Sequence, residues 1–140
     1  MTSGPWLIDN SALARLDIVE IAAVVVPRIR DGLVGVSIVS ELEVGFSARS
    51  TANYRATRES VIDHLIPVAL PFRAEARARE VQSMLVGLGQ HRSPGVADLL
   101  IAATAELEGF TVLHYDADFD LVGAVTGQPM EWVIPRGSSS

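Results

Sequence analysis

The chain has 140 residues, of which 49% are hydrophobic and 20% charged, and its formal net charge is -6. This length and composition predict a single domain with a sizeable core and exclude an intrinsically disordered chain. The absence of cysteine excludes disulfides and thiolate metal sites and fits a reducing compartment, so we expect a cytoplasmic protein. No apolar stretch suits a membrane span, no secretory signal is visible, and the acidic balance argues against an evenly basic nucleic-acid-binding surface.

The predicted elements alternate between strand and helix along the chain. In order, they are a strand at 6–8, a helix at 18–30 interrupted near Pro27, a strand at 33–39, a helix opening at 40–42, a helix at 51–65, a strand at 66–70, helices at 74–88 and 96–107, and strands at 110–113 and 131–134. Ser11 and Ser40 are candidate helix caps, and residues 115–119 are predicted to form a turn.

Strands that are separated by helical crossovers predict a parallel sheet with helices on both faces. We therefore expect an α/β fold, a three-layer α/β/α sandwich with a central parallel sheet. Residues 1–135 are expected to form the single domain and residues 136–140 a flexible C-terminal tail.

Five widely spaced carboxylates are predicted to share one edge of this sheet. Asp9, Asp116 and Asp118 follow strands, whereas Glu41 and Asp98 lie in the first turns of helices that pack back on the sheet. Open α/β sheets place their ligand sites at this edge. Two unit charges about 4 Å apart repel by about 4 kcal/mol at an effective dielectric of about 20, and the chain contains no lysine to neutralise them. An oxygen-rich acidic pocket suits Mg²⁺ or Mn²⁺, which indicates metal-dependent phosphate chemistry.

Each acid also has a purely structural interpretation. Asp9 could cap the helix that follows it, and Glu41 and Asp98 could simply favour helix dipoles. Asp116 and Asp118 could stabilise an Asx-type turn. These separate roles do not explain why all five share one edge, so we favour a common site. Other acidic residues, Glu43 among them, are assigned to the solvated surface.

Four motifs then resemble the PIN-domain family in their order and spacing. They are the segments at 7–11 (LIDNS), 40–45 (SELEVG), 98–103 (DLLIAA) and 116–119 (DADF). Together they cover nearly the whole chain. In chain length and in the residues of these motifs, the sequence most resembles the VapC-type toxins of toxin–antitoxin pairs. The resemblance implies a PIN-like sandwich, a Mg²⁺- or Mn²⁺-dependent ribonuclease, a homodimer, and inhibition by a small VapB-type antitoxin.

The resemblance also implies roles for particular residues. The catalytic acids would be Asp9, Glu41, Asp98 and Asp116, with Asp9, Asp98 and Asp116 holding the metal and with Asp118 and Ser11 as auxiliary residues. Glu41 is preferred over Glu43 because the family pattern places a glycine, here Gly45, after Glu-Leu and two further residues. His114 departs from the small hydroxyl residue that many relatives carry two positions before the last core aspartate.

The implied reaction is hydrolysis of an RNA phosphodiester by metal-activated water, which leaves 5′-phosphate and 3′-hydroxyl ends. Stem-loops of tRNA or rRNA are the expected substrate class. Arg15, Arg49 and His114 are candidate substrate contacts, and further arginines could bind phosphates, namely Arg55, Arg73, Arg77 and Arg92. The alternative function is a catalytically silent PIN-like RNA-binding or scaffold module. An aspartyl-phosphate phosphotransferase is disfavoured because such sites rely on a lysine.

Three expectations concern residues outside the acidic set. His64 and His91 are expected at the surface. The aromatic side chains are expected to pack in the core and at the sheet edge, namely Trp6, Phe110, Phe119 and Trp132. An apolar helical face at residues 18–26 is a candidate contributor to a dimer interface.

Overall fold

A computed structural model describes residues 3–138, and its centre is a five-stranded sheet. The strands are β1 (Trp6–Ile8), β2 (Val34–Ser37), β3 (Ile66–Val68), β4 (Thr111–His114) and β5 (Met130–Trp132). Their order is β3-β2-β1-β4-β5, and every pairing is parallel. This confirms the predicted parallel sheet.

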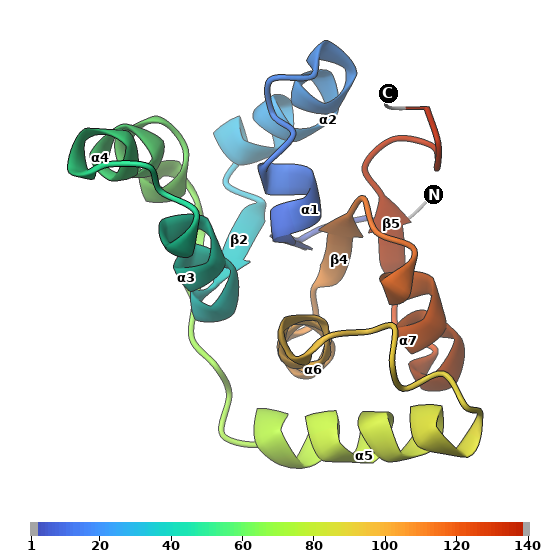
Figure 1. Ribbon diagram of the computed structural model, residues 1–140. Helices are drawn as coiled ribbons and strands as arrows, with labels where there is room; N and C mark the ends of the chain where they lie inside the picture. Colours follow the sequence, from blue (N-terminus) through green and yellow to red (C-terminus); the bar gives the residue numbers. More distant parts are fainter. Residues whose placement is uncertain (1–2, 139–140) are drawn as a thin grey trace.

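Helices connect the strands and cover both faces of the sheet (Figure 1). They are α1 (Asn10–Leu13), α2 (Val19–Arg30), α3 (Ile38–Phe46), α4 (Thr51–Ser60), the 3₁₀ turn η1 (Ile62–His64), α5 (Ala74–Gly87), α6 (Val96–Glu108) and α7 (Asp118–Thr126). Figure 1 shows α1 and α2 on one side of the sheet and α5 and α6 on the other, which is the expected three-layer sandwich.

Two separate hydrophobic cores lie against the two faces, because side chains along each strand alternate between them. In β1, Ile8 packs with α1, α2 and β2 in the first core, whereas Leu7 packs with α5, α6 and α7 in the second. Ile21 and Val25 of α2 are fully buried in the first core. The core of the domain therefore uses Ile21 and Val25 of this apolar face, whereas Val19 is exposed, and a contribution of residues 18–26 to a dimer interface stays a prediction.

The strand order changes direction between β1 and β4. The chain first adds β2 and β3 on one side of β1, and then crosses through α5 and α6 to place β4 on the other side. Ligands of open α/β sheets bind outside the carboxyl ends of the strands at such a switch point. Asp9 directly follows β1, and Asp116 lies two residues after β4 ends.

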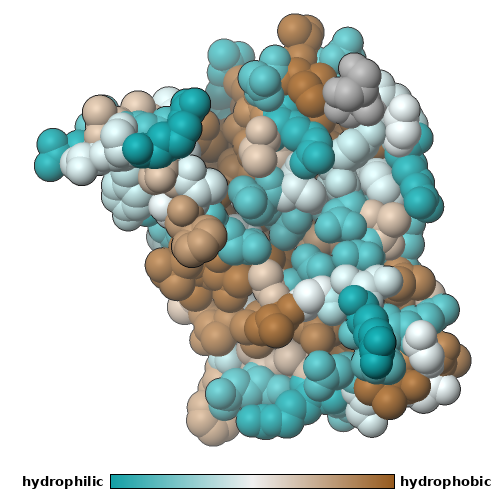
Figure 2. Space-filling model, viewed as in Figure 1, coloured by the Kyte–Doolittle hydropathy of each residue, from teal (hydrophilic) through white to brown (hydrophobic). Residues whose placement is uncertain are grey.

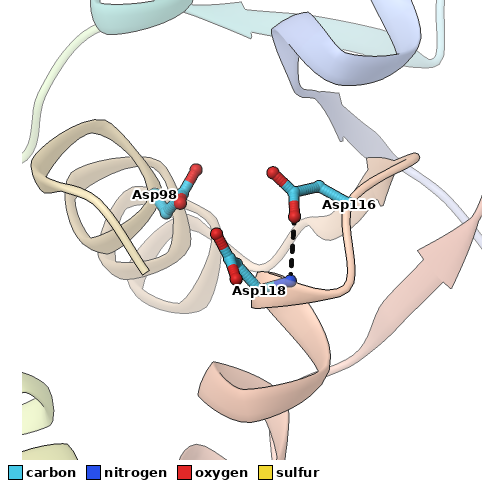
Figure 3. Close-up of side chains that lie close together, drawn as sticks. All are labelled: Asp98, Asp116 and Asp118. Atoms are coloured by element: carbon cyan, nitrogen blue, oxygen red, sulfur yellow. Dashed lines mark hydrogen bonds between the residues drawn. The ribbon is translucent and has the colours of Figure 1, made fainter. Parts of the chain in front are cut away.

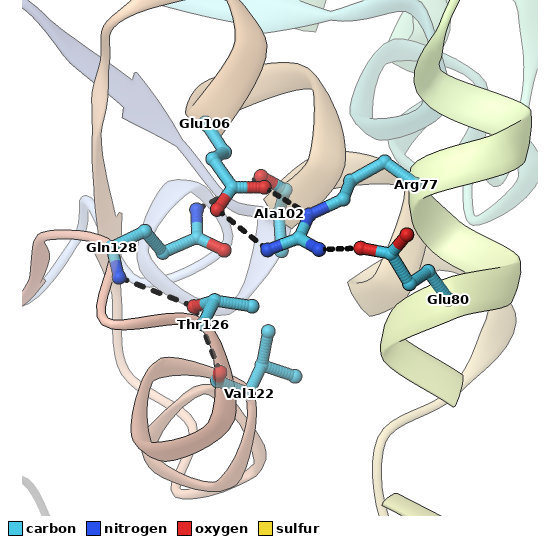
Figure 4. Close-up of polar contacts among 7 residues, drawn as sticks. All are labelled: Arg77, Glu80, Ala102, Glu106, Val122, Thr126 and Gln128. Carbon is cyan, nitrogen blue, oxygen red and sulfur yellow. Dashed lines mark hydrogen bonds and ion pairs between the residues drawn. The ribbon is translucent and has the colours of Figure 1, made fainter. Parts of the chain in front are cut away.

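Polar contacts fix the helices that cover the second face (Figure 4). Arg77 of α5 makes a two-pronged contact with Glu106 of α6, at 2.6 and 3.0 Å, and also pairs with Glu80. The buried amide of Gln128 donates to the Ala102 carbonyl at 2.9 Å and so ties the end of α7 to α6. The predicted role of Arg77 as a phosphate contact is wrong, because its guanidinium is committed to this network.

Several predicted boundaries differ from the structure. The α7 helix was missed, and residues 118–119 belong to it rather than to a turn.

Two predicted helix caps also differ. The cap of α3 is Ser37, whose Oγ accepts from the Val39 amide, while Ser40 is buried inside the helix. The cap of α1 is Asp9 and not Ser11. Pro27 does not interrupt α2, because burial of neighbouring apolar residues offsets the lost hydrogen bond.

No helix among the described residues is long and apolar enough to cross a membrane. The tail expected at 136–140 lies partly outside the described residues, which end at Ser138. Within the described part, Ser138 donates from its amide to the Pro135 carbonyl at 3.1 Å.

Candidate metal centre

Three aspartates converge at the carboxyl edge of the sheet, as Figure 3 shows. One carboxylate oxygen from each of Asp98, Asp116 and Asp118 lies within 4.8 Å of the other two. Asp98 comes from the first turn of α6, Asp116 from the loop after β4, and Asp118 from the start of α7. A group of this kind offers a divalent cation several oxygen ligands at once.

Backbone amides hold two of these carboxylates in place. Asp98 accepts from the Gly95 amide at 2.9 Å, which caps α6, and Asp116 accepts from the Asp118 amide at 2.9 Å in an Asx-type turn. The Asx-type turn predicted for Asp116 is thus confirmed, and Asp98, predicted to favour the helix dipole, accepts a capping hydrogen bond in the first turn. These hydrogen bonds do not compete with metal binding, because each carboxylate has a second oxygen and the amide fixes its orientation.

Asp9 is buried beside this group, with 4% of its surface exposed. Its Oδ2 accepts from the Ser11 amide at 2.8 Å, and the Ser11 hydroxyl accepts from the Tyr115 amide at 2.8 Å. Ser11 therefore links the start of α1 to the end of β4. This arrangement supports the expected auxiliary role of Ser11, although the residue does not cap the helix.

Burial first, and then repulsion from neighbouring acids, raises the pKa values of Asp9, Asp98 and Asp118. Burial raises the pKa of Asp98 to about 6, and repulsion from Asp9, Asp116 and Asp118 adds to the increase. Burial also raises the pKa of Asp9, with a smaller contribution from Asp116. In Asp118 the causes are again burial and Asp116. A bound cation would reverse these shifts, since it favours the charged carboxylates.

Glu41 does not join the aspartates. Its Oε1 pairs with the Arg58 guanidinium of α4 at 3.2 Å, and it lines a small space together with Gly45 and Tyr54. The structure thus contradicts the predicted position of Glu41 among the catalytic acids. The physical reason is the helical repeat, since Glu41 faces the side of α3 that packs on α4.

Glu43 is the carboxylate that α3 presents to the site. Residues two apart on a helix are about 200° apart, so Glu43 points away from Arg58. It lines an open groove of about 560 Å³ with Asn10, the residue next to Asp9. Burial raises the pKa of Glu43, and repulsion from Asp9 adds to the rise. Sequence reasoning assigned Glu43 to the surface. The helical period alone could not have found it, because Glu41 and Glu43 lie at equal angles on either side of the face that carries the buried Ser40 and half-buried Val44.

His114 lies beneath the site and is fully buried. Its Nδ1 accepts from the Asp116 amide at 3.2 Å, which replaces the hydrogen bond expected from a small hydroxyl residue. The ring packs 5.0 Å from those of Phe119 and Trp132, and burial lowers its pKa to about 4. The predicted substrate contact by His114 is therefore wrong, because the ring supports the Asp116 loop from inside the fold.

The two predicted arginine contacts differ in their placement. Arg15 lies at the edge of the site, where its Nη1 donates to the Ser11 carbonyl at 2.7 Å. Arg49 is exposed in the loop between α3 and α4, and its amide donates to Asn53. A role for Arg49 in substrate binding remains a prediction.

Comparisons with known proteins agree with this geometry. The PIN domain family matches residues 7–125. Ribonuclease VapC2 of Mycobacterium tuberculosis (strain CDC 1551 / Oshkosh) is 47% identical over 141 residues, with all of both chains covered. Ribonuclease VapC21 of the same strain is 38% identical over 134 residues, covering 96% of this chain and 97% of the relative.

Solved structures show the same fold. The DNA-bound VapBC of Salmonella typhimurium superimposes with a TM-score of 0.77 at 18% identity, covering 92% of this chain and 98% of that chain. VapBC-5 of Mycobacterium tuberculosis gives a TM-score of 0.60 at 26% identity, covering 89% of this chain and 94% of that chain.

These similarities define an α/β nuclease fold whose acidic centre lies at the switch point of a parallel sheet. The chain belongs to the PIN-domain family and, within it, to the VapC ribonucleases.

Proposed function

We propose that this protein is a Mg²⁺- or Mn²⁺-dependent endoribonuclease toxin that cleaves RNA by attack of water on a phosphodiester. The observation that carries the proposal is the cluster of Asp98, Asp116 and Asp118, whose oxygens lie within 4.8 Å of one another. Among residues 3–138, no ion pair engages any of these three carboxylates. An all-oxygen donor set without a protein cation suits a hard divalent ion.

The residues present fit such an ion well. Asp98, Asp116 and Asp118 would hold it, and Asp9 is buried close enough to raise the pKa of Asp98. When bound, the ion lowers the pKa of water and stabilises negative charge on the reacting phosphate. Asp118, expected only as an auxiliary residue, thus becomes part of the proposed ligand set.

The chain's own groups would orient the reacting atoms. Glu43 lines the same groove as Asn10 and can accept a hydrogen bond from the attacking water. Ser11 holds the buried Asp9 carboxylate toward Asp98 and Asp116. Because water attacks rather than the ribose 2′-hydroxyl, the products would carry 5′-phosphate and 3′-hydroxyl ends.

The direct test is cleavage of total RNA by purified protein with Mg²⁺, Mn²⁺ or EDTA. We expect cleavage only with a divalent ion and a loss of at least about a hundredfold in Asp9→Asn and Asp116→Asn. Asp17→Asn, an exposed change on a different loop, is the matched control and should cleave normally. Mapping the ends distinguishes a 5′-phosphate from a cyclic phosphate. Metal-independent cleavage would refute the mechanism, and a soluble protein that binds RNA without cutting it would favour the silent binding module.

A paired comparison tests the assignment on α3. Glu43→Gln should weaken Mn²⁺ binding, measured by calorimetry, and slow cleavage more than Glu41→Gln does. The Glu41 change removes the ion pair with Arg58, so its effect should appear in thermal stability. A greater loss of metal affinity in Glu41→Gln would restore the role first given to Glu41.

Neutralisation by a VapB-type antitoxin is part of the proposal, supported by solved neighbours that are VapBC complexes. We place the protein and its tRNA or rRNA substrate in the bacterial cytoplasm. Growth should stop when this chain is expressed there without an antitoxin. Co-expression of a VapB-type protein that binds the chain should restore growth. Normal growth with soluble, wild-type protein would contradict the toxin role.

A homodimer is also proposed, and the exposed apolar stripe of α3 is the surface that supports it. Ile38, Leu42 and Phe46 follow one another at four-residue spacing, and Phe46 is 93% exposed. Figure 2 shows hydrophobic surface over this helix. Light scattering should give a dimer for the wild type and a monomer for Phe46→Ser. A monomeric wild type would refute the proposal.

A further inference from the structure

Two aromatic rings lie side by side next to the acidic centre, and the proposed reaction does not use them. Tyr115 directly precedes Asp116, and its ring meets that of Trp132 edge to face, with centroids 5.4 Å apart and an interplanar angle of 86°. Trp132 ends β5 and pairs in register with His114 of β4. Both rings are therefore at the same carboxyl edge of the sheet as the aspartates.

An arginine flanks each ring. The Arg15 guanidinium lies 5.3 Å from the centroid of Tyr115, and the Arg136 guanidinium lies 5.9 Å from that of Trp132. The result is a continuous row in the order Arg15, Tyr115, Trp132 and Arg136, which we call the Arg-aromatic row. Its residues come from the turn after α1, the loop after β4, the end of β5 and the C-terminal segment, so the fold assembles it from four parts of the chain.

The row is open to solvent in part. Tyr115 and Trp132 are half-buried, and Arg136 is exposed. The indole nitrogen of Trp132 donates to the Asp120 carboxylate at 3.0 Å, a contact at the surface that fixes the plane of the ring. Arg15 is anchored by the Ser11 carbonyl at 2.7 Å. These contacts hold the planar groups in place before any ligand arrives, which lowers the entropy cost of binding.

The chemistry of the row matches single-stranded RNA. Unpaired bases stack on aromatic rings and on guanidinium planes, and arginines bind the phosphates between them. The row also supplies positive charge beside a centre of several carboxylates, in a chain of net charge -6. The two guanidiniums would offset part of the repulsion between these carboxylates and an approaching phosphate backbone.

We propose that the Arg-aromatic row is a nucleotide-binding subsite, which stacks an unpaired RNA base against Trp132 and places the adjoining phosphates between Arg15 and Arg136. The inference rests on the proposed function in that the bound strand continues into the acidic centre. It selects unpaired segments over duplex, because a base inside a helix cannot reach the ring.

The test measures RNA binding without cleavage. A short single-stranded RNA is titrated into the full chain carrying Asp9→Asn, with Mg²⁺ present, and its affinity is followed by fluorescence anisotropy. We expect Trp132→Leu to weaken binding by about five- to a hundredfold, the range for the loss of one stacked base. Arg136→Gln should weaken it by a smaller factor and reduce its salt dependence. Arg79→Gln, an exposed change on α5, is the matched control and should bind as before.

Two further readouts make the proposal specific. Tryptophan fluorescence should be quenched by RNA in protein that retains Trp132, and the quench should disappear in Trp132→Phe, where only the buried Trp6 remains. An RNA that lacks the stacked base should bind the starting protein as weakly as intact RNA binds Trp132→Leu. If Trp132→Leu does not fold, the exposed Arg136 and the abasic RNA still decide the question.

The outcomes separate this inference from the proposed function. Cleavage by the wild type together with unchanged RNA affinity in Arg136→Gln and equal binding of abasic RNA would overturn the subsite alone. Binding that depends on the row in a wild type that never cleaves would overturn the reaction and retain the subsite. Duplex RNA that binds as tightly as single strands would also overturn the subsite.

Discussion

Replacing Asp98 with asparagine should make the metal-free protein more stable. The carboxylate lies among Asp9, Asp116 and Asp118, which repel it, and burial removes part of its hydration. Asparagine is almost the same size and its side-chain oxygen can still accept from the Gly95 amide, so the cap of α6 is kept. The change therefore removes the charge and little else.

The size of the effect follows from the raised pKa. A rise from 3.8 to about 6 corresponds to about 3 kcal/mol of unfavourable interaction for the charged form, which solvent screening reduces to about 1–2 kcal/mol. Because the folded pKa is the higher one, this penalty is complete above pH 6, shrinks as the pH falls, and vanishes below pH 3.8. The advantage of Asp98→Asn should follow the same course.

Urea unfolding measures this difference. In EDTA at pH 7.5 the variant should unfold at a higher urea concentration than the wild type, and at pH 4 the two curves should approach each other. Saturating Mg²⁺ should reverse the order, because a ligand at about a hundred times its dissociation constant stabilises the wild type by about 2.7 kcal/mol and the variant by less.

A destabilised Asp98→Asn in EDTA would refute the reasoning, since it would show that burial and the neighbouring carboxylates do not penalise the charged form of Asp98 in the folded protein. Equal stabilisation of both proteins by Mg²⁺ would separate Asp98 from the metal. The exposed change Asp17→Asn serves as the control for a general effect of net charge. Mg²⁺ should shift its urea unfolding curve by the same amount as that of the wild type.

Three further changes test the surroundings of the site. Leu85→Ala, in the second core, should cost about 2–5 kcal/mol by urea unfolding, and a loss below 1 kcal/mol would mean loose packing of α5. Gly109→Ala should lower the melting temperature, because Gly109 ends α6 at a φ of 78°, and an unchanged value would contradict that backbone. Ser11→Ala should cost about 1–3 kcal/mol and weaken Mn²⁺ binding, as the Tyr115 amide loses its acceptor; unaltered affinity would limit Ser11 to a structural role.

The sequence was sufficient for the sheet and for three of its acids. Asp9 follows a short apolar strand, Asp116 follows another, and Asp98 lies in the first turn of a strongly helical segment. Parallel topology then brings strand ends and helix starts to one edge. These positions follow from the local hydrophobic pattern and from the right-handed crossover between parallel strands. Both rules can be applied to a single sequence.

The sequence was insufficient where two patterns competed. The position of Gly45 in the family motif favoured Glu41 over Glu43 as the catalytic residue. Only the packing of α3 against α4 and α1, however, decides which of the two carboxylates faces Asp9. The α7 helix was missed because six of its nine residues (two aspartates, two valines, one glycine and one threonine) have low helical propensity. Its burial of Phe119 and Val122 against the second core stabilises it instead.

The Arg-aromatic row illustrates a different limit. Trp132 was expected to pack at the sheet edge, and it does contact His114 at 5.0 Å. Arg15, beside Tyr115, and Arg136, beside Trp132, lie near opposite ends of the chain, so no local window could show that they flank one surface. Only the pairing of β5 with β4 places Tyr115 and Trp132 together.

The crossing of the chain between β3 and β4 also determines when the acidic centre can exist during synthesis. A ribosome that has released the sequence only as far as α6 has made Asp9 and Asp98, but their companions Asp116 and Asp118 are still to come. Every shorter fragment is an incomplete site, whatever it folds into. The metal centre is therefore complete only after the segment that follows β4 has been made.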